Sequence, residues 1–175
     1  ESPAVLAYRA AEATGFLDFP VMRAIDVVRV LTHAIENYPG YEKLFDSTVR
    51  ITAERTSEAN AGKLVLERAS RQIESKQFYE AIRQLGRARA LFAKEECASE
   101  LIHTLSLEGF AYYSVGLFWA ARTCFLMAID RILKRFRSEN FLDKRLVTNL
   151  KILIRAELLL GRVSPAMAWI EILAL

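Results

Sequence analysis

The residue types that most often carry out chemistry are scarce in this sequence, which has two histidines and two cysteines among 175 residues. His33 and Glu36 would share one helix face, but no third ligand is suggested nearby, and zinc needs three or four protein ligands. His103 lacks the flanking acid or nucleophile that a catalytic imidazole needs. Phosphate-loop, dinucleotide-binding and nucleophile-elbow motifs are absent from the sequence. We therefore expect no enzyme activity, no metal and no cofactor.

The cysteines indicate a compartment rather than a site. Cys97 and Cys124 each fall in a segment with helical spacing of apolar residues, and two cysteines make neither a disulfide framework nor a metal site. We interpret them as free thiols, buried or half-buried, which suits a reducing, cytoplasmic environment. No signal peptide is visible. Because the sequence begins at Glu1 without methionine, we expect it to be a segment of a longer protein.

Composition bounds the fold class. Apolar residues make up 53% of the chain and charged residues 26%, with 7 glycines and 4 prolines. This mixture excludes a disordered, collagenous or low-complexity chain, and it has too few turn formers for a sandwich of many short strands. A net charge of +3 does not imply a polyanion partner.

One apolar stretch is long enough to be compared with a transmembrane helix. Between Gly109 and Ile129 the only charged residue is Arg122, and about 20 apolar residues are enough to span a bilayer. Gly116, however, separates two segments that each have their own helical periodicity, which is typical of a corner between two helices. We therefore expect no membrane insertion.

Apolar residues recur at helical spacing along almost the whole chain, and no segment alternates with period two. The sequence therefore predicts an all-α fold of about nine helices without strands. Ser164 is the predicted N-cap of the last helix and Pro165 its first residue. The predicted helices cover residues 3–14, 18–38, 41–55, 57–75, 78–95, 99–114, 118–137, 141–160 and 165–175, with the third and fourth alternatively forming one continuous rod.

Three of the predicted corners are alike, at residues 75–81, 115–121 and 160–166. Each has a turn residue, an apolar residue two positions later and an alanine five positions later. These alanines, Ala81, Ala121 and Ala166, are 40 and 45 residues apart. Twelve residues before the first two alanines stand Ala69 and Gly109, small residues that let the two helices of a hairpin approach closely.

These hairpins resemble the tetratricopeptide repeat, whose two antiparallel helices follow W-x2-L-G-x2-Y and then A-x3-F. In the middle copy Leu105 takes the tryptophan position and Tyr112 the tyrosine position, while Ile154 replaces the small residue in the third copy. The positions expected to pack the repeats are Ala69, Ala81, Ala88, Gly109, Gly116, Ala121, Phe125, Ala128, Gly161 and Ala166.

The resemblance implies a right-handed solenoid of helical hairpins. Its three repeats would cover residues 62–98, 99–140 and 141–175, and residues 1–60 would add helices that pack on the array, with a degenerate repeat as the alternative for this segment. The spacings of 40 and 45 residues exceed the 34 residues usual for the family, and the closing proline is absent. Armadillo or HEAT repeats, with periods of about 40–47 residues, are therefore the alternative architecture.

The resemblance also implies a concave groove lined by the first helix of each repeat, where the family binds peptides. Lys151 and Arg155 would share one helix face and suit a carboxylate. Ser70 and Phe110 stand where carboxylate-clamp members use asparagine, so recognition of chaperone tails is not supported. The groove positions are Lys63, Ser70, Glu74, His103, Ser106, Phe110, Tyr113, Lys151 and Arg155.

Basic residues concentrate late in the chain, with nine Lys or Arg against three acids between Arg131 and Arg162. Such a cluster suits an acidic protein or a nucleic acid, but several of these cations fall in the last turns of a helix, where they meet the helix dipole favourably. We expect a non-catalytic module that binds a protein or peptide and is part of a larger scaffold or regulator. The alternatives are a peptide- or ligand-sensing regulatory domain and, more weakly, a helical repeat that binds nucleic acid.

The last predicted helix is apolar on more than one side, so one neighbouring helix cannot cover it. We expect Trp169 and Leu173 to pack against the preceding helix. Met167 or Ile172 would then contact further repeats or a second copy of the chain.

Overall fold

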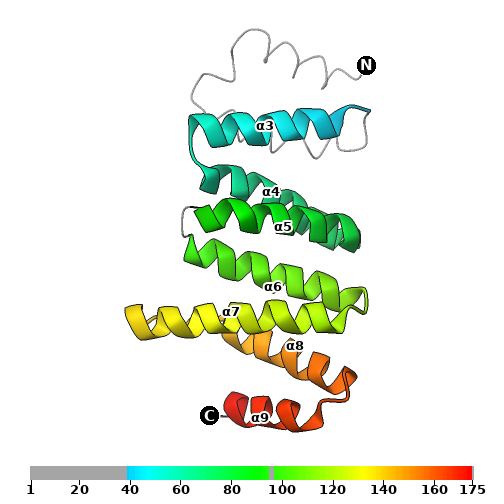
Figure 1. Cartoon of the computed structure of the whole chain (residues 1–175), viewed down its shortest axis with the longest axis vertical. Coiled ribbons are helices and arrows are strands. Elements are labelled where there is room, and N and C mark those ends of the chain that lie inside the picture. The colour runs from blue at the N-terminus through cyan, green and yellow to red at the C-terminus, as the bar shows by residue number, and fades with distance from the viewer. Residues whose placement is uncertain (1–38, 95–96, 175) are drawn as a thin grey trace. The chain divides into compact units, whose positions relative to one another are not determined.

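The computed structural model describes residues 39–94 and 97–174 (Figure 1). The all-α prediction is confirmed, since these residues form seven helices and no strand. The two helices predicted before residue 39 lie outside the described residues, as do His33 and Glu36. The seven helices are α3 (Tyr41–Arg55), α4 (Glu58–Glu74), α5 (Phe78–Lys94), α6 (Ala98–Ser114), α7 (Phe118–Glu139), α8 (Arg145–Leu159) and α9 (Val163–Ala174).

The chain divides into two compact units, Glu1–Leu64 and Val65–Leu175, and the boundary falls inside α4. In the first unit α3 buries Tyr41, Phe45 and Val49, which are spaced four residues apart and so form one stripe. Thr56 ends this helix, and the hydroxyl of Ser57 accepts a hydrogen bond from the N–H of Asn60 at 3.1 Å, as an N-cap does. The alternative of one continuous rod is therefore wrong.

In the second unit the three corners share one hydrogen-bond pattern. In the middle corner the N–H groups of Gly116 and Leu117 donate to the carbonyls of Tyr113 and Tyr112, at 3.1 and 2.9 Å. The corners after α4 and α8 repeat both bonds at the equivalent residues, and each pattern closes a helix in the Schellman manner. The residue at the centre has a positive φ in every corner: 60° at Lys76, 80° at Gly116 and 71° at Gly161.

The side chain at Lys76 strains this position, because a Cβ atom is disfavoured at positive φ. We expect Lys76→Gly to raise the free energy of unfolding by about 1 kcal/mol, measured by urea denaturation. Lys76→Ala is the matched control, since it removes the charge and keeps the Cβ atom. Equal stabilisation by both substitutions would show that backbone strain is not the cause.

Two helix starts differ from the prediction by more than one residue. Asn140, at φ 52°, ends α7, and the carboxylate of Asp143 then accepts the N–H of Arg145 at 2.9 Å, so α8 begins at Arg145 rather than at Phe141. The last helix begins at Val163 because the preceding corner fixes its start. Pro165 therefore lies inside the first turn, where its missing N–H group is not needed, and Ser164 is not the N-cap.

Consecutive helices of the second unit pack on one another from α5 to α9, and α6 also contacts α8 (Figure 1). A Cβ atom added to Gly109 would lie 2.9 Å from Cζ of Phe125, so glycine sets the close approach of α6 and α7. Gly116 and Gly161 are exposed in the corners and contribute backbone conformation instead of packing. The residues with no exposed surface include Ala69, Ala81, Ala88, Ala121, Phe125, Ala128 and Ala166.

The long apolar stretch that suggested a membrane span is broken at Gly116, between α6 and α7. Across the described part of the chain, no helix combines the length and apolarity needed to cross a bilayer.

Candidate functional site

The predicted groove residues do not share one environment in the structure. Lys63 belongs to the first unit, whereas the other groove residues belong to the second. On α4, Ser70 is half-buried and donates its hydroxyl to the carbonyl of Leu66 at 3.0 Å, and Glu74 is exposed.

Two predicted groove residues of α6 take part in helix packing. The hydroxyl of Ser106 accepts a hydrogen bond from the Nδ2 group of Asn149 at 2.9 Å, which joins α6 to α8. The ring of Tyr113 lies 5.5 Å from that of Phe118, edge to face, and packs against the core cluster that contains Phe125. Both side chains are half-buried, and the Ser106 hydroxyl and the Tyr113 ring make their contacts with neighbouring helices.

Three other groove residues remain accessible. Phe110 is 38% exposed, although one edge of its ring meets Phe78 at a centroid distance of 6.4 Å. Lys151 and Arg155 are exposed and one helical turn apart on α8. Among the described residues neither cation has an acidic partner within 4 Å.

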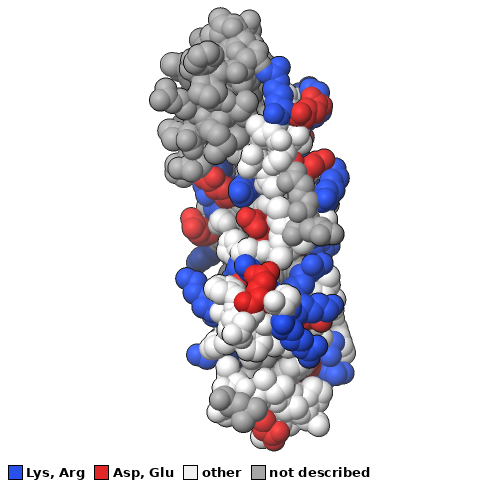
Figure 2. All heavy atoms as spheres, turned by 90° about the vertical axis from the view of Figure 1, so that its left-hand side faces the viewer, with Lys and Arg blue, Asp and Glu red and all other residues white. Residues whose placement is uncertain are grey.

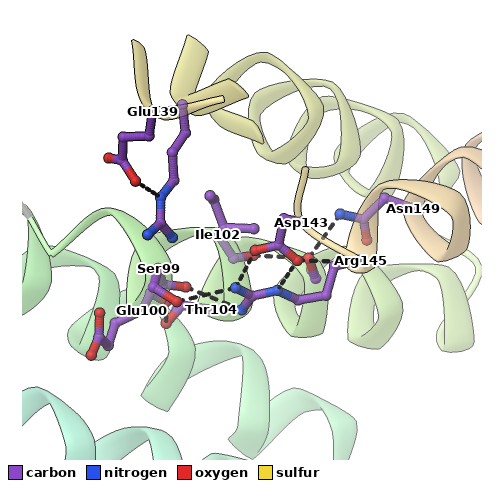
Figure 3. A network of polar contacts seen from close by, with 10 residues as sticks. Ser99, Glu100, Ile102, Thr104, Glu139, Asp143, Arg145 and Asn149 are labelled. Atoms are coloured by element: carbon purple, nitrogen blue, oxygen red, sulfur yellow. Dashed lines mark hydrogen bonds and ion pairs between the residues drawn. The ribbon is translucent and has the colours of Figure 1, made fainter. Parts of the chain in front are cut away.

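A pocket of about 690 Å³ opens where α6, the end of α7 and the start of α8 meet. His103 is the one predicted groove residue in its wall. Figure 3 shows the polar network beside it, drawn from the same helices and from the connection between α7 and α8. The pocket is lined by Ser99, His103, Arg135, Phe141, Leu142, Asp143, Lys144 and Arg145.

Arg145 is held rigidly in this wall (Figure 3). Its guanidinium group makes two contacts with the carboxylate of Asp143, one of them at 2.8 Å, and donates to the carbonyl and hydroxyl of Ser99 at 3.1 and 3.2 Å. The hydrogen bond from Arg145 lowers the pKa of Asp143, against the opposing effect of burial. The ion pair therefore fastens the α7–α8 connection to the start of α6.

Arg135 is also occupied, because its Nε group contacts Glu139 at 2.7 Å. Its guanidinium carbon lies 4.9 Å from the centre of the Phe141 ring, so that the aromatic side chain is held at the pocket by a cation–π contact. The pocket thus has two arginines that are already neutralised by acids and an apolar surface formed by Phe141 and Leu142.

The remaining polar groups are His103 and Lys144. Burial and the charge of Arg145 lower the pKa of His103, and Asp143 opposes this shift, so the imidazole is neutral at pH 7. Lys144 is exposed and has no ion pair with any residue that the structure describes. The wall therefore offers one unpaired cation and a neutral imidazole beside apolar side chains.

The pocket does not assemble a nucleophilic relay. Ser99, His103 and Asp143 all line it, but Arg145 binds both the hydroxyl of Ser99 and the carboxylate of Asp143. A hydrolytic triad needs the histidine between those two groups. Arg145 therefore occupies the two groups that the histidine of a triad would have to link.

Cys97 is half-buried and Cys124 is buried, and the structure shows no disulfide between them. Burial, with a smaller contribution from Glu108, raises the pKa of Cys124 to about 12, so this thiol stays protonated and is a poor nucleophile. Within residues 39–94 and 97–174, no three His, Cys, Asp or Glu side chains gather to hold a metal ion.

Sequence reasoning missed most of the pocket. Among the predicted groove residues only His103 lines it, and the helix predicted over residues 141–160 begins at Arg145, so that residues 141–143 form the connection before α8. The available signal was the concentration of cations between Arg131 and Arg162, which includes three of the lining residues. A scan against protein-family models gives no match, and a search of curated proteins gives no significant match.

Proposed function

We propose that the chain is a non-catalytic, tetratricopeptide-like helical module that binds a protein segment carrying an acidic side chain next to an apolar one. One observation carries this proposal: the unpaired cation Lys144 borders a pocket whose apolar wall is Phe141 and Leu142. A carboxylate of the ligand would pair with Lys144, and an apolar group next to it would pack against Phe141 and Leu142.

The pocket is preorganised for this ligand. Arg145 and Asp143 tie its wall to Ser99, so that little conformational freedom remains to be lost on binding. Lys144 follows Asp143 directly and is therefore presented by the fixed part of the connection. A ligand would then meet a lysine whose backbone position is fixed.

The exposed faces of α6 and α8 extend the site. His103 and Phe110 are seven residues apart, so they lie on one face of α6, and Arg155 is exposed on α8. We propose that a bound segment runs from the pocket along these faces, with Phe110 as a second apolar contact and Arg155 as a second cation. Such a module would serve as one segment of a larger scaffold or regulator.

Selection from a library of short random peptides tests the proposal. We expect the selected peptides to be enriched in Asp or Glu next to Leu, Ile or Phe. Lys144→Ala should lower the affinity for such a peptide about threefold to tenfold at low salt, and less at high salt. Lys134→Ala is the matched control, because Lys134 is an exposed lysine of α7 paired with Asp130 at 2.8 Å. Selection of peptides without acidic residues, or an equal loss of affinity in both variants, would refute the proposal.

Binding should also depend on pH through His103. Its pKa is lowered in the free protein, and a bound carboxylate would raise it, so that binding takes up a proton. The affinity should therefore rise as the pH falls from 7.5 to 5.5. Arg145 and Asp143 are the charged groups that shift its pKa in the free protein, and Arg135 and Lys144 line the same pocket. His103→Gln should flatten the pH profile, and an unchanged profile would show that His103 is not at the ligand.

A further inference from the structure

A second, smaller pocket of about 310 Å³ lies at the corner between α6 and α7 and is called the corner pocket below. It opens where this corner meets the end of α8 (Figure 1), whereas the pocket at Lys144 lies at the starts of α6 and α8. The two pockets are thus at opposite ends of the same helices. The corner pocket lies between two consecutive hairpins and not on the end face of the last one. Its wall consists of Gly116, Leu117, Phe118, Trp119, Ala120 and Leu160.

The wall of the corner pocket presents an uncovered aromatic ring. Trp119 is 58% exposed, and Leu117 beside it is 48% exposed. Trp119 lies in the first turn of α7, where the N–H of Ala121 donates to the carbonyl of Leu117 at 3.0 Å. The ring therefore extends from a fixed helix start and offers a surface on which a planar group can stack.

Two guanidinium groups lie beside this ring. The Cζ atoms of Arg162 and Arg122 are 5.5 and 5.9 Å from the centre of the Trp119 ring. The Nε groups of both arginines contact one carboxylate, that of Glu157, at 2.7 and 2.8 Å. Glu157 has no exposed surface, so this carboxylate holds both guanidinium groups in place from inside the fold.

The two arginines leave one positive charge uncompensated, because they share a single acid. Among the described residues, the Nη groups of Arg122 and Arg162 have no hydrogen-bond acceptor. Both side chains are partly exposed, so an anion in solution can reach them. The opposite edge of the array differs, since Lys and Arg lie next to Asp and Glu there (Figure 2), and Arg135 and Arg145 each have an acid of their own.

The charge of the cluster favours a ligand with a single negative charge. A monoanion at the Nη groups would neutralise the uncompensated charge through charge-assisted hydrogen bonds. A dianion such as a phosphate monoester would exceed that charge and would be repelled by the nearby carboxylate of Glu157. The volume of the corner pocket is at the lower end of the range of about 300–1,000 Å³ for ligand sites, which suits one ring system.

We propose that the corner pocket binds a small aromatic monocarboxylate, with its ring stacked on Trp119 and its carboxylate bound by the Nη groups of Arg122 and Arg162. The ring would cover the exposed indole, and the carboxylate would bridge the corner before α7 and the corner after α8. Because the pocket at Lys144 is at the other end of these helices, this proposal does not depend on peptide binding there.

Isothermal titration calorimetry with 2-naphthoate as the probe tests the proposal. 2-Naphthamide is the matched ligand, because it keeps the planar ring and lacks the charge, and it should bind about tenfold more weakly. Cyclohexanecarboxylate, which keeps the charge and lacks an aromatic ring, should also bind more weakly than 2-naphthoate. The affinity for 2-naphthoate should fall as the salt concentration rises.

Two protein variants locate the probe. Trp119→Leu should lower the affinity for 2-naphthoate about fivefold, because leucine keeps the wall apolar and removes the stacking surface. Arg162→Gln should lower it about tenfold, since Arg122 would still pair with Glu157 and no positive charge would remain uncompensated. Tyr79→Leu is the matched control and should leave the affinity unchanged, because Tyr79 is exposed at the equivalent position of the preceding corner.

Four results would overturn the proposal. The first is absence of binding, or equal affinities for 2-naphthoate and 2-naphthamide. The second is an equal affinity of Trp119→Leu and Tyr79→Leu for 2-naphthoate. The third is a loss of affinity in Lys144→Ala that Trp119→Leu does not share, which would place 2-naphthoate in the other pocket. The fourth is tighter binding of a short peptide that ends in tryptophan, which would assign the corner pocket to a protein terminus.

Discussion

Replacing Glu157 with alanine is expected to lower the free energy of unfolding by about 3 kcal/mol. Its carboxylate has no exposed surface and contacts the Nε groups of Arg122 and Arg162 at 2.8 and 2.7 Å. Both guanidinium groups also lie beside the ring of Trp119, at 5.9 and 5.5 Å from its centre. Removing the acid would leave two neighbouring cations without their partner. Because both arginines are partly exposed, water would screen their repulsion, so the loss stays at the lower end for a buried pair.

Urea denaturation measures this loss. Glu171→Ala is the matched control, since Glu171 is exposed on α9, and it should change the free energy of unfolding by less than about 0.5 kcal/mol. Glu157→Gln should give an intermediate loss, because the amide oxygen still accepts one hydrogen bond. A loss in the free energy of unfolding below about 1 kcal/mol for Glu157→Ala would mean that water solvates the two guanidinium groups as well as the carboxylate does.

Ala121→Leu is expected to lower the free energy of unfolding by about 2 kcal/mol. Ala121 has no exposed surface and belongs to the cluster of Phe125, Ile129, Leu150 and Leu153. A leucine at this position would force α7 away from its neighbours. Ala90→Leu, at an exposed position of α5, is the matched control and should be nearly neutral. An unchanged stability of Ala121→Leu would contradict the close packing of Ala121 in this cluster.

The corners could be predicted from the sequence because their signals are local. A turn residue, an apolar residue and an alanine lie within seven residues, and they fix a hydrogen-bond pattern that also lies within one helix end. Gly116 and Gly161 at positive φ are recognisable without knowledge of the fold. Lys76 shows that the same conformation forms without glycine, at the cost of strain.

The pocket could not be predicted because it depends on distant residues. Arg145 reaches Ser99 across 46 positions of the chain, and no local pattern reveals that pairing. The apolar residues Phe141 and Leu142 fit a helical period and were assigned to a helix, whereas Asn140 turns the chain before them. Glu157 has no exposed surface, although an acid in an amphipathic helix usually faces solvent.

The roles of the groove residues depend on which helix lies next to each one. Ser106 and Lys151 occupy equivalent positions 45 residues apart. Ser106 is bound to Asn149 because α8 lies beside it, whereas Lys151 is exposed. Matching positions to a repeat pattern identifies the equivalence, but only the three-dimensional arrangement separates a packing residue from an exposed one.

A nuclear magnetic resonance titration with a selected acidic and apolar peptide tests the central claim most directly. The amide resonances of Ser99, His103 and residues 141–145 should shift together on binding, and Lys144→Ala should reduce these shifts at equal peptide concentration. Lys134→Ala should leave them intact. Shifts that cluster elsewhere, or that persist unchanged in Lys144→Ala, would contradict the assignment of this pocket as the binding site.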